Sequence, residues 1–334
     1  MKIAVIGAGA IGSLVASYLK LKGLDVYLVS HPDGIKAVKE KGLKVSGVRG
    51  NFKVAIGIEE KLISNPELLI LATKTQDVEL ALKNNLGLIK DSVILTTQNG
   101  VQAEKIVAGF IPKNNIFSSI VMFGATYLEP GKVVHNFEGS WILGSIFSDA
   151  TDPRLLSISM VLDKAFPVVI SKDIAKMKYL KIFVNANNCI PAVLGVSMQE
   201  AFADPEVSKI SIAIWKEGFQ IISKLGIKLV SLPGFPIENI TKLIAMPSDE
   251  AANIFSGIMS RLSQEALYGS ILQSIKRGRP SEIDYINGEF VSLADKDWLK
   301  VDLNRRLVVM VHEVEKTGRF FTKAELLEAT AKDY

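Results

Sequence analysis

The first third of the chain alternates short apolar runs with amphipathic stretches. The apolar runs predict buried strands, and the stretches between them repeat their apolar residues every three or four positions, as helices do. Strands are expected over 3–6, 25–29, 68–72 and 93–96, with helices over 10–22 and 33–41. Because parallel strands need a crossover between them, this alternation predicts an α/β fold built on a doubly wound parallel sheet.

The pattern changes in the second half of the chain. Runs between 116 and 169, at 118–122, 132–135 and 141–143, are expected to complete the same sheet. Beyond them helical periodicity dominates, over 173–195, 205–226, 237–245, 249–277, 281–296 and 302–317. The sequence therefore predicts two domains, 1–170 with the sheet and 171–334 all-helical, and a small-molecule site in the cleft between them.

Composition narrows the class of protein. The 334 residues carry a net charge of +4, and the basic residues are scattered, with their densest cluster at 276–279. A nucleic-acid partner is therefore poorly supported, whereas a small anionic ligand suits this balance. The single Cys and three His exclude a disulfide framework and a Cys-based zinc site, so no metal is expected.

The start of the chain bears on location. Met1 and Lys2 lead directly into an apolar strand, without the pattern of an export signal, and no apolar run approaches the ~18 residues of a membrane span. We expect a cytoplasmic protein with no membrane partner. The amphipathic helices do not fix the oligomeric state, for which a homodimer is the working expectation.

A glycine-rich turn follows the first strand and opens the first helix. Its sequence is Gly-Ala-Gly-Ala-Ile-Gly at 7–12. Gly7 permits a tight turn, Gly9 lets the backbone approach a pyrophosphate, and Gly12 allows close helix packing, while the helix N-terminus stabilises the phosphates. This context predicts a Rossmann-type dinucleotide site made by Gly7, Gly9, Ala10, Ile11 and Gly12; a turn without a ligand is the alternative.

The end of the second strand discriminates between dinucleotides. A carboxylate there would accept hydrogen bonds from a ribose 2′-hydroxyl, but this strand is followed by Ser30 and His31, with no acidic residue at its tip. The site should not repel a 2′-phosphate, and Ser30, His31 and Lys36 are candidates to contact one. NADP is thus favoured and NAD is the alternative; His31 also reads as an exposed loop residue.

Four further motifs occur in one order along the chain. They are Leu-Ala-Thr-Lys at 71–74, Thr-Gln-Asn-Gly-Val at 97–101, Lys181 with Asn185, and Ser270 ahead of Ser-Glu-Ile-Asp-Tyr-Ile-Asn-Gly at 281–288. Over most of its length the chain thereby resembles the ketopantoate reductase family. The resemblance implies NADPH-dependent reduction of 2-dehydropantoate to (R)-pantoate, on the route to pantothenate and coenzyme A.

The resemblance also implies roles for individual residues. Lys181 matches the general acid that protonates the ketone oxygen as nicotinamide delivers hydride. Glu282 matches an acid near that lysine that supports substrate binding and catalysis, and it is also a cofactor-binding candidate. Asn185 and Ser270 match residues that hold the substrate's hydroxyl and carboxylate. Lys74 and Asn99 match residues at strand tips beside nicotinamide and substrate.

The spacing of these residues is compatible with the roles. On one helix, Lys181, Asn185 and Asn188 project from nearly one face, so Asn188 joins the substrate-binding candidates. Reducing a ketone places negative charge on oxygen, and a protonated lysine can neutralise it. The alternatives are a solvated lysine, as expected for Lys176 and Lys178, and a Glu282 that only stabilises the first turn of a helix.

The chain departs from the family pattern at three places. The second Asn, eight residues after the lysine, is replaced by Cys189, which reads as a small core residue. His31 replaces an arginine that meets the 2′-phosphate, and the residues around Ser270 differ at Gly269, Ile271 and Ser274. Another 2-oxo acid therefore stays open as substrate. A non-catalytic dinucleotide sensor is the alternative function. Lys181 and Glu282 argue against it, because a sensor needs neither a proton donor nor an acidic partner for it.

Overall fold

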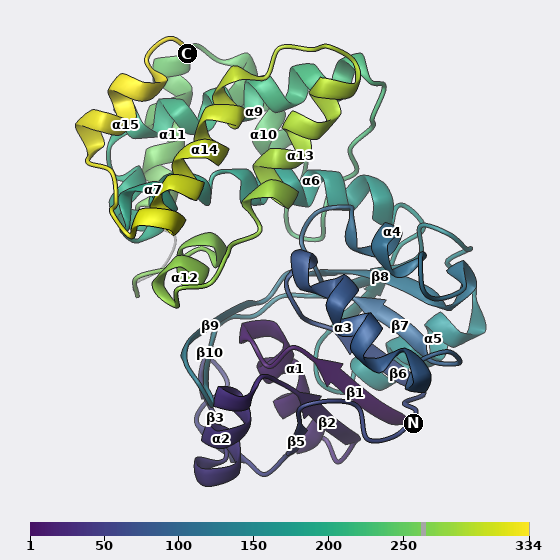
Figure 1. Ribbon diagram of the computed structural model, residues 1–334. Helices are drawn as coiled ribbons and strands as arrows, with labels where there is room; N and C mark the ends of the chain where they lie inside the picture. Colours follow the sequence, from purple (N-terminus) through teal and green to yellow (C-terminus); the bar gives the residue numbers. More distant parts are fainter. Residues whose placement is uncertain (262–264, 334) are drawn as a thin grey trace. The chain divides into compact units, whose positions relative to one another are not determined.

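The computed structural model describes residues 1–261 and 265–333 of the chain. These residues form two compact units, Met1–Ala175 and Lys176–Tyr334, each described here by itself. The first contains all the named strands together with helices, and the second is built from helices (Figure 1). The expected α/β half and helical half are both present.

An eight-stranded sheet forms the centre of the first unit. Its order is β12-β11-β8-β7-β6-β1-β2-β5. The strands are β1 (Lys2–Ile6), β2 (Asp25–Val29), β5 (Gly57–Glu59), β6 (Leu68–Leu71), β7 (Val93–Thr96), β8 (Ile116–Val121), β11 (Trp141–Gly144) and β12 (Val168–Ile170). Neighbours are parallel except β8 and β11. The prediction of a doubly wound parallel sheet is confirmed, with β8 and β11 as an antiparallel pair within it.

Both faces of this sheet are buried. Along β1, Ile3 and Val5 pack into one hydrophobic core, whereas Ala4 and Ile6 pack into another. Successive side chains of a strand point to opposite faces, so a continuous apolar run requires cover on both. The helices of this unit are α1 (Ala10–Leu21), α2 (Pro32–Lys41), α3 (Val78–Asn85), α4 (Ala103–Val107) and α5 (Pro153–Leu162).

A second, four-stranded sheet was not predicted. Its order is β4-β3-β10-β9, from β4 (Phe52–Val54), β3 (Leu43–Gly47), β10 (Lys132–Phe137) and β9 (Gly124–Glu129). From its sequence, the run 132–135 is expected to complete the main sheet. That prediction is wrong, because the run belongs to the second sheet. Its alternation explains why: Val133 and His135 are buried while Val134 is exposed, the pattern of a strand with one covered face. His135 meets α1 through a 3.1 Å hydrogen bond to Tyr18.

The second unit contains ten helices among its described residues. They are α6 (Ile174–Ala186), α7 (Cys189–Leu194), α8 (Met198–Phe202), α9 (Pro205–Lys224), α10 (Glu238–Ala245), α11 (Ser248–Met259), α12 (Ser270–Lys276), α13 (Ile283–Lys296), α14 (Asp302–Thr317) and α15 (Lys323–Thr330). Helices α8 and α15 were not predicted. The single helix expected over 249–277 is two helices, α11 and α12, and 262–264 lie outside the described residues.

The single helix expected over 173–195 is also two helices, separated by a turn at Asn187 and Asn188. There the Asn188 N–H donates to the Asn185 carbonyl at 2.9 Å, a three-residue step that interrupts the helical ladder. Asparagine competes for backbone hydrogen bonds and has a low helix propensity, which favours a break at this point. Asn188 is therefore not on the helix that carries Lys181 and Asn185.

Exposure corrects one further expectation, which concerns a lysine. Trp141 and Trp215 are buried and Trp298 is 94% exposed. Lys178, expected to be solvated, is 3% exposed. No helix in the described part of the chain is long and apolar enough to cross a membrane.

Candidate active site

The glycine turn of the first unit is shaped by contacts of its backbone. Gly7 has φ +107°, and a Cβ there would lie 2.6 Å from backbone atoms of Ala72 and Thr73. A Cβ on Gly12 would collide with the Gly7 carbonyl oxygen. At Gly9, by contrast, a Cβ would meet no protein atom within 4 Å. Gly7 and Gly12 are thus required by the fold, whereas Gly9 leaves open space beside the turn.

The start of α1 lies beside that open space and has no side-chain cap. Its N-cap, Gly9, makes no side-chain hydrogen bond, and its first turn carries no acidic residue. The first N–H groups of a helix lack intrahelical acceptors and bear partial positive charge, so this terminus suits an anion. A bare Gly9 next to such a terminus fits the pyrophosphate of a dinucleotide, which Ala10 and Ile11 would then contact.

Two strand tips lie beside the glycine turn. Thr73 and Lys74 follow β6, and Asn99 follows β7. Gln98, buried between them, donates from its amide to the Leu71 and Thr73 carbonyls at 3.0 Å each. This brace ties the end of β7 to the end of β6. It sets Lys74 and Asn99, both partly buried, at the carboxyl edge of the sheet, where open α/β sheets bind ligands.

The tip of β2 carries Ser30 and His31 as expected. His31 is exposed and forms the N-cap position of α2, while the hydroxyl of Ser30 packs over Gly34 in the next turn. An acidic residue does reach this tip, but from the neighbouring strand: Glu59 of β5 pairs with Val29. Its carboxylate lies 3.7 Å from the Lys39 ammonium, which partly neutralises it.

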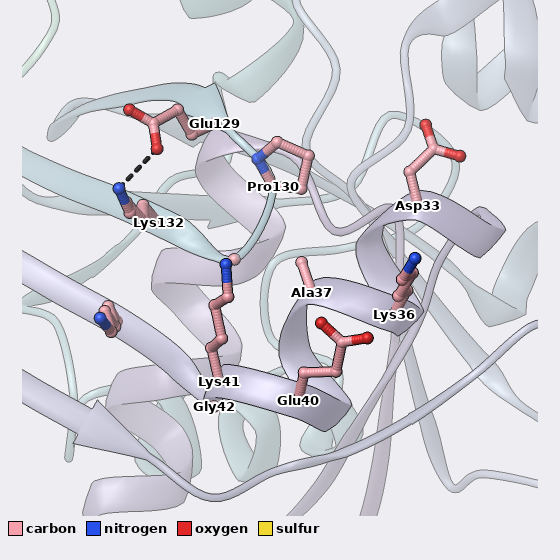
Figure 2. A pocket seen from close by; sticks show the side chains of 11 residues that line it. Asp33, Lys36, Ala37, Glu40, Lys41, Gly42, Glu129, Pro130 and Lys132 are labelled. Carbon is pink, nitrogen blue, oxygen red and sulfur yellow. Dashed lines mark hydrogen bonds and ion pairs between the residues drawn. The ribbon is translucent and has the colours of Figure 1, made fainter.

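Lys36 lines a different feature of the first unit. A cavity of about 360 Å³ lies between α2 and the turn that joins β9 to β10. Figure 2 shows the α2 side chains on one side of it and Pro130 on the other. Its walls carry both charges, including the ion pair of Lys132 with Glu129 at 2.5 Å. The cavity contains none of the predicted catalytic residues.

Lys181 and Asn185 lie on α6 of the second unit, one turn apart and both partly buried. Burial lowers the pKa of Lys181 from 10.5 to about 8, because the charged ammonium loses solvation. A lysine with this pKa is mostly protonated at neutral pH and is a stronger acid than a solvated lysine. Such a shift is typical of a proton donor in a functional site.

The turn after α6 brings Asn188 to a second candidate. A Cβ on Gly269 would lie 3.1 Å from the Asn188 amide carbon, so Asn188 packs directly against the residue before Ser270. Asn187, which the sequence did not single out, is 4% exposed. Among the residues that the structure describes, neither its amide nitrogen nor its amide oxygen has a hydrogen-bond partner.

The motif at 281–288 has a structural role that sequence alone did not reveal. Asn287 on α13 donates to the Ala186 carbonyl at 3.1 Å, and so holds the end of α6. It also donates to Asn304 at 3.0 Å and to the Cys189 sulfur at 3.7 Å. Burial raises the pKa of Cys189 to about 12, so this thiol is the inert core residue that was expected.

Glu282 begins the same motif. It is 3% exposed and stands at the N-cap position of α13, with backbone angles outside the helical region. Burying a carboxylate is costly unless other groups form hydrogen bonds or ion pairs with it. Among the described residues, no cluster of His, Cys, Asp and Glu could hold a metal ion.

Comparison with known proteins matches both units. The family model described as ketopantoate reductase PanE/ApbA matches residues 3–147, and its C-terminal counterpart matches 173–315. A 2-dehydropantoate 2-reductase of Pyrococcus horikoshii is 30% identical over 325 residues, covering 95% of this chain and 99% of the relative. One of Archaeoglobus fulgidus is 26% identical, covering 94% and 98%.

Among solved structures, D-mandelate dehydrogenase with NADH and anilino(oxo)acetate has a TM-score of 0.79 at 26% identity, covering 95% of this chain and 99% of that chain. Together the matches span the sheet unit and the helical unit, in the order that the motifs predicted. The chain belongs to the ketopantoate reductase family of oxidoreductases.

Proposed function

We propose that this protein reduces 2-dehydropantoate to (R)-pantoate with NADPH, and that Lys181 donates the proton. The observation that carries the proposal is the lysine ammonium on α6 whose pKa burial lowers to about 8, one turn before Asn185. A solvated surface lysine, the alternative reading, would keep the ordinary pKa. The relatives named 2-dehydropantoate 2-reductase support the substrate.

The proton step follows from the acidity of Lys181. When bound, reduced nicotinamide supplies a hydride to the carbonyl carbon, and negative charge develops on the carbonyl oxygen. Lys181 gives that oxygen a proton from Nζ and is left as a neutral amine, which then takes a proton from water. General acid catalysis is most efficient when the pKa of the acid lies near the working pH, which favours a pKa of about 8 over 10.5.

The remaining groups orient the substrate. The Asn185 amide and the Ser270 hydroxyl can each hold a hydroxyl or carboxylate oxygen, and Asn188, packed against Gly269, belongs to the same polar wall. Glu282 is the acidic residue that we assign to the same site. In the first unit, Asn99 and Lys74 occupy the sheet edge where the nicotinamide end of a dinucleotide would lie.

NADPH is the proposed donor because no acidic residue follows β2 directly and Ser30 and His31 can contact a 2′-phosphate. Glu59 weakens that preference, since its carboxylate could accept from a ribose hydroxyl, but Lys39 offsets it. The structure of D-mandelate dehydrogenase contains NADH, which keeps NAD as the alternative.

The pH dependence of turnover tests the acid. Lys181 must be protonated to act, so kcat/KM for reduction should be constant below pH 8 and fall about tenfold per pH unit above it. The fall in kcat/KM begins near pH 8 because the lowered pKa makes the Lys181 ammonium lose its proton at a lower pH than an ordinary lysine does. A profile measured in buffers of constant ionic strength that stays flat to pH 10 would contradict the assignment.

Asn187 gives a second prediction. If its unpartnered amide meets the substrate, Asn187→Leu should raise KM about tenfold, the cost of one good hydrogen bond. The same change should raise the melting temperature, because it removes two buried polar atoms that lack partners in the described protein. Asn253→Leu, at an exposed position of α11 outside the proposed site, is the matched control and should leave KM unchanged. An unchanged KM in N187L would remove Asn187 from the site.

The similarity to D-mandelate dehydrogenase favours one second candidate, reduction of a 2-oxo acid that carries an aromatic ring. The departures at Cys189, Ile271 and Ser274 lie in the segments that would contact the substrate. A panel of 2-oxo acids, branched, hydroxylated and aromatic, assayed by loss of reduced-nicotinamide absorbance with NADPH and with NADH, separates the candidates. If the protein reduces none of the 2-oxo acids in the panel, the proposed function is wrong.

A further inference from the structure

A closed ring of hydrogen bonds surrounds the backbone of Glu282. The Ser281 N–H donates to one carboxylate oxygen of Glu315 on α14 at 2.7 Å. The other oxygen of Glu315 lies 2.9 Å from His312 Nδ1, and His312 Nε2 lies 2.9 Å from the Asp284 carboxylate on α13. Because Ser281 and Asp284 flank Glu282 in the chain, the ring fixes this segment from both sides.

His312 makes both of its contacts as a donor. Carboxylates accept hydrogen bonds and do not donate, so each ring nitrogen must carry a proton. Burial by itself would lower the pKa of His312, but the hydrogen bonds to Asp284 and Glu315 and their charges outweigh it and raise the pKa above 6.5. As an imidazolium, His312 links the first turn of α13 to the last turns of α14.

The ring is better suited to positioning than to holding the helices together. His312 and Asp284 are 45% and 56% exposed, and ion pairs this open contribute little to stability. A second exposed pair, Arg305 with Asp295, joins the same two helices near the other end of α13. The ring differs from that pair because it includes the Ser281 backbone N–H, which lies next to the buried Glu282 in the chain.

We propose that His312 is a positioning residue for the reaction: through Glu315 it holds the Ser281 amide, and so fixes the backbone from which the Glu282 carboxylate acts. This inference deepens the proposed function and rests on it. His312 lies on an amphipathic helix, and its spacing in the sequence gives no reason to single it out. The placement of Glu282 thus depends on a residue 30 positions further along the chain.

The test is a double-mutant cycle on the full chain. His312→Ala should lower kcat about tenfold, the size of effect expected when a reacting group is displaced by a fraction of an ångström, with dinucleotide affinity unchanged. In a Glu282→Gln background, adding His312→Ala should cause no further loss, because the residue through which it acts is already changed. Arg305→Gln, which breaks the other pair between α13 and α14, should leave kcat within twofold.

Melting temperatures separate positioning from general stability, and assays are run well below them. If His312→Ala does not fold, His312→Leu, which fills the space of the ring but donates to neither Glu315 nor Asp284, takes its place in the cycle. Losses that multiply in the double mutant, an unchanged kcat in the single mutant, or an equal loss in R305Q would each overturn the inference alone. A wild type that reduces no 2-oxo acid would overturn the proposed function and the inference with it.

Discussion

Lys181→Ala should lower kcat by about 100-fold to 10,000-fold while the affinity for the dinucleotide stays unchanged, because it removes the proton donor and keeps the glycine turn that would bind the pyrophosphate. The measurements are steady-state turnover of the best substrate of the panel and a binding titration with the reduced dinucleotide. The large effect is expected because, without a donor, the developing oxyanion must take its proton from water.

Two comparisons make this result specific. Lys176→Ala, an exposed lysine on the same helix, should retain full turnover. Lys181→Arg keeps the positive charge but replaces the donor with a far weaker acid, so it should keep substrate affinity better than Lys181→Ala and still lose most of kcat. Normal turnover in K181A would refute the assignment of Lys181 as the acid.

Gly9→Leu should lower dinucleotide affinity by at least about 100-fold without destabilising the protein. Apart from its neighbours in the chain, no atom of the described residues lies within 4 Å of a Cβ at Gly9, so a side chain there enters open space beside the turn, where a ligand would approach. The pyrophosphate would lose its close approach to the backbone at the start of α1. Affinity is measured by titration with the reduced dinucleotide, and stability by thermal unfolding.

The other glycines supply the controls. Gly87→Leu is the matched variant, because a Cβ at Gly87 also meets no atom within 4 Å, and it should change neither quantity. Gly12→Ala should instead unfold the protein at lower temperature, since its Cβ would collide with the Gly7 carbonyl oxygen. A G9L variant that binds the dinucleotide as tightly as wild type would show that the turn is structural only.

Much of the fold is predictable where the signal is local. The strands over 25–29 and 93–96 match β2 and β7 at both ends, and the turn at 7–12 opens a helix as its glycines predict. These elements depend on short apolar runs and on conformations that only glycine adopts readily. The order of the family motifs was equally visible in sequence, and the family models match both units.

Two predictions of secondary structure and strand pairing are wrong, at 132–135 and at 173–195. The apolar run at 132–135 indicates a strand but not its partner, and the structure pairs it with β3 in a separate sheet. The run 173–195 is periodic throughout, yet Asn287 from a distant helix holds the end of α6 at Ala186 and a turn follows. At 132–135 the deciding contact joins residues far apart in the chain. At 173–195 such a contact adds to the local tendency of Asn187 and Asn188 to end a helix.

The sequence by itself determined the class of fold, the glycine turn and the family, and it predicted Lys181, Asn185 and Glu282 as site residues. Only the tertiary structure decided that burial acidifies Lys181, that Gln98 binds two strand tips together, and that His312 and Glu315 hold the segment around Glu282. The physical reason is the distance along the chain over which each effect acts. Turn geometry and periodicity act over a few residues, whereas solvation and hydrogen-bond partners depend on what the folded chain brings alongside.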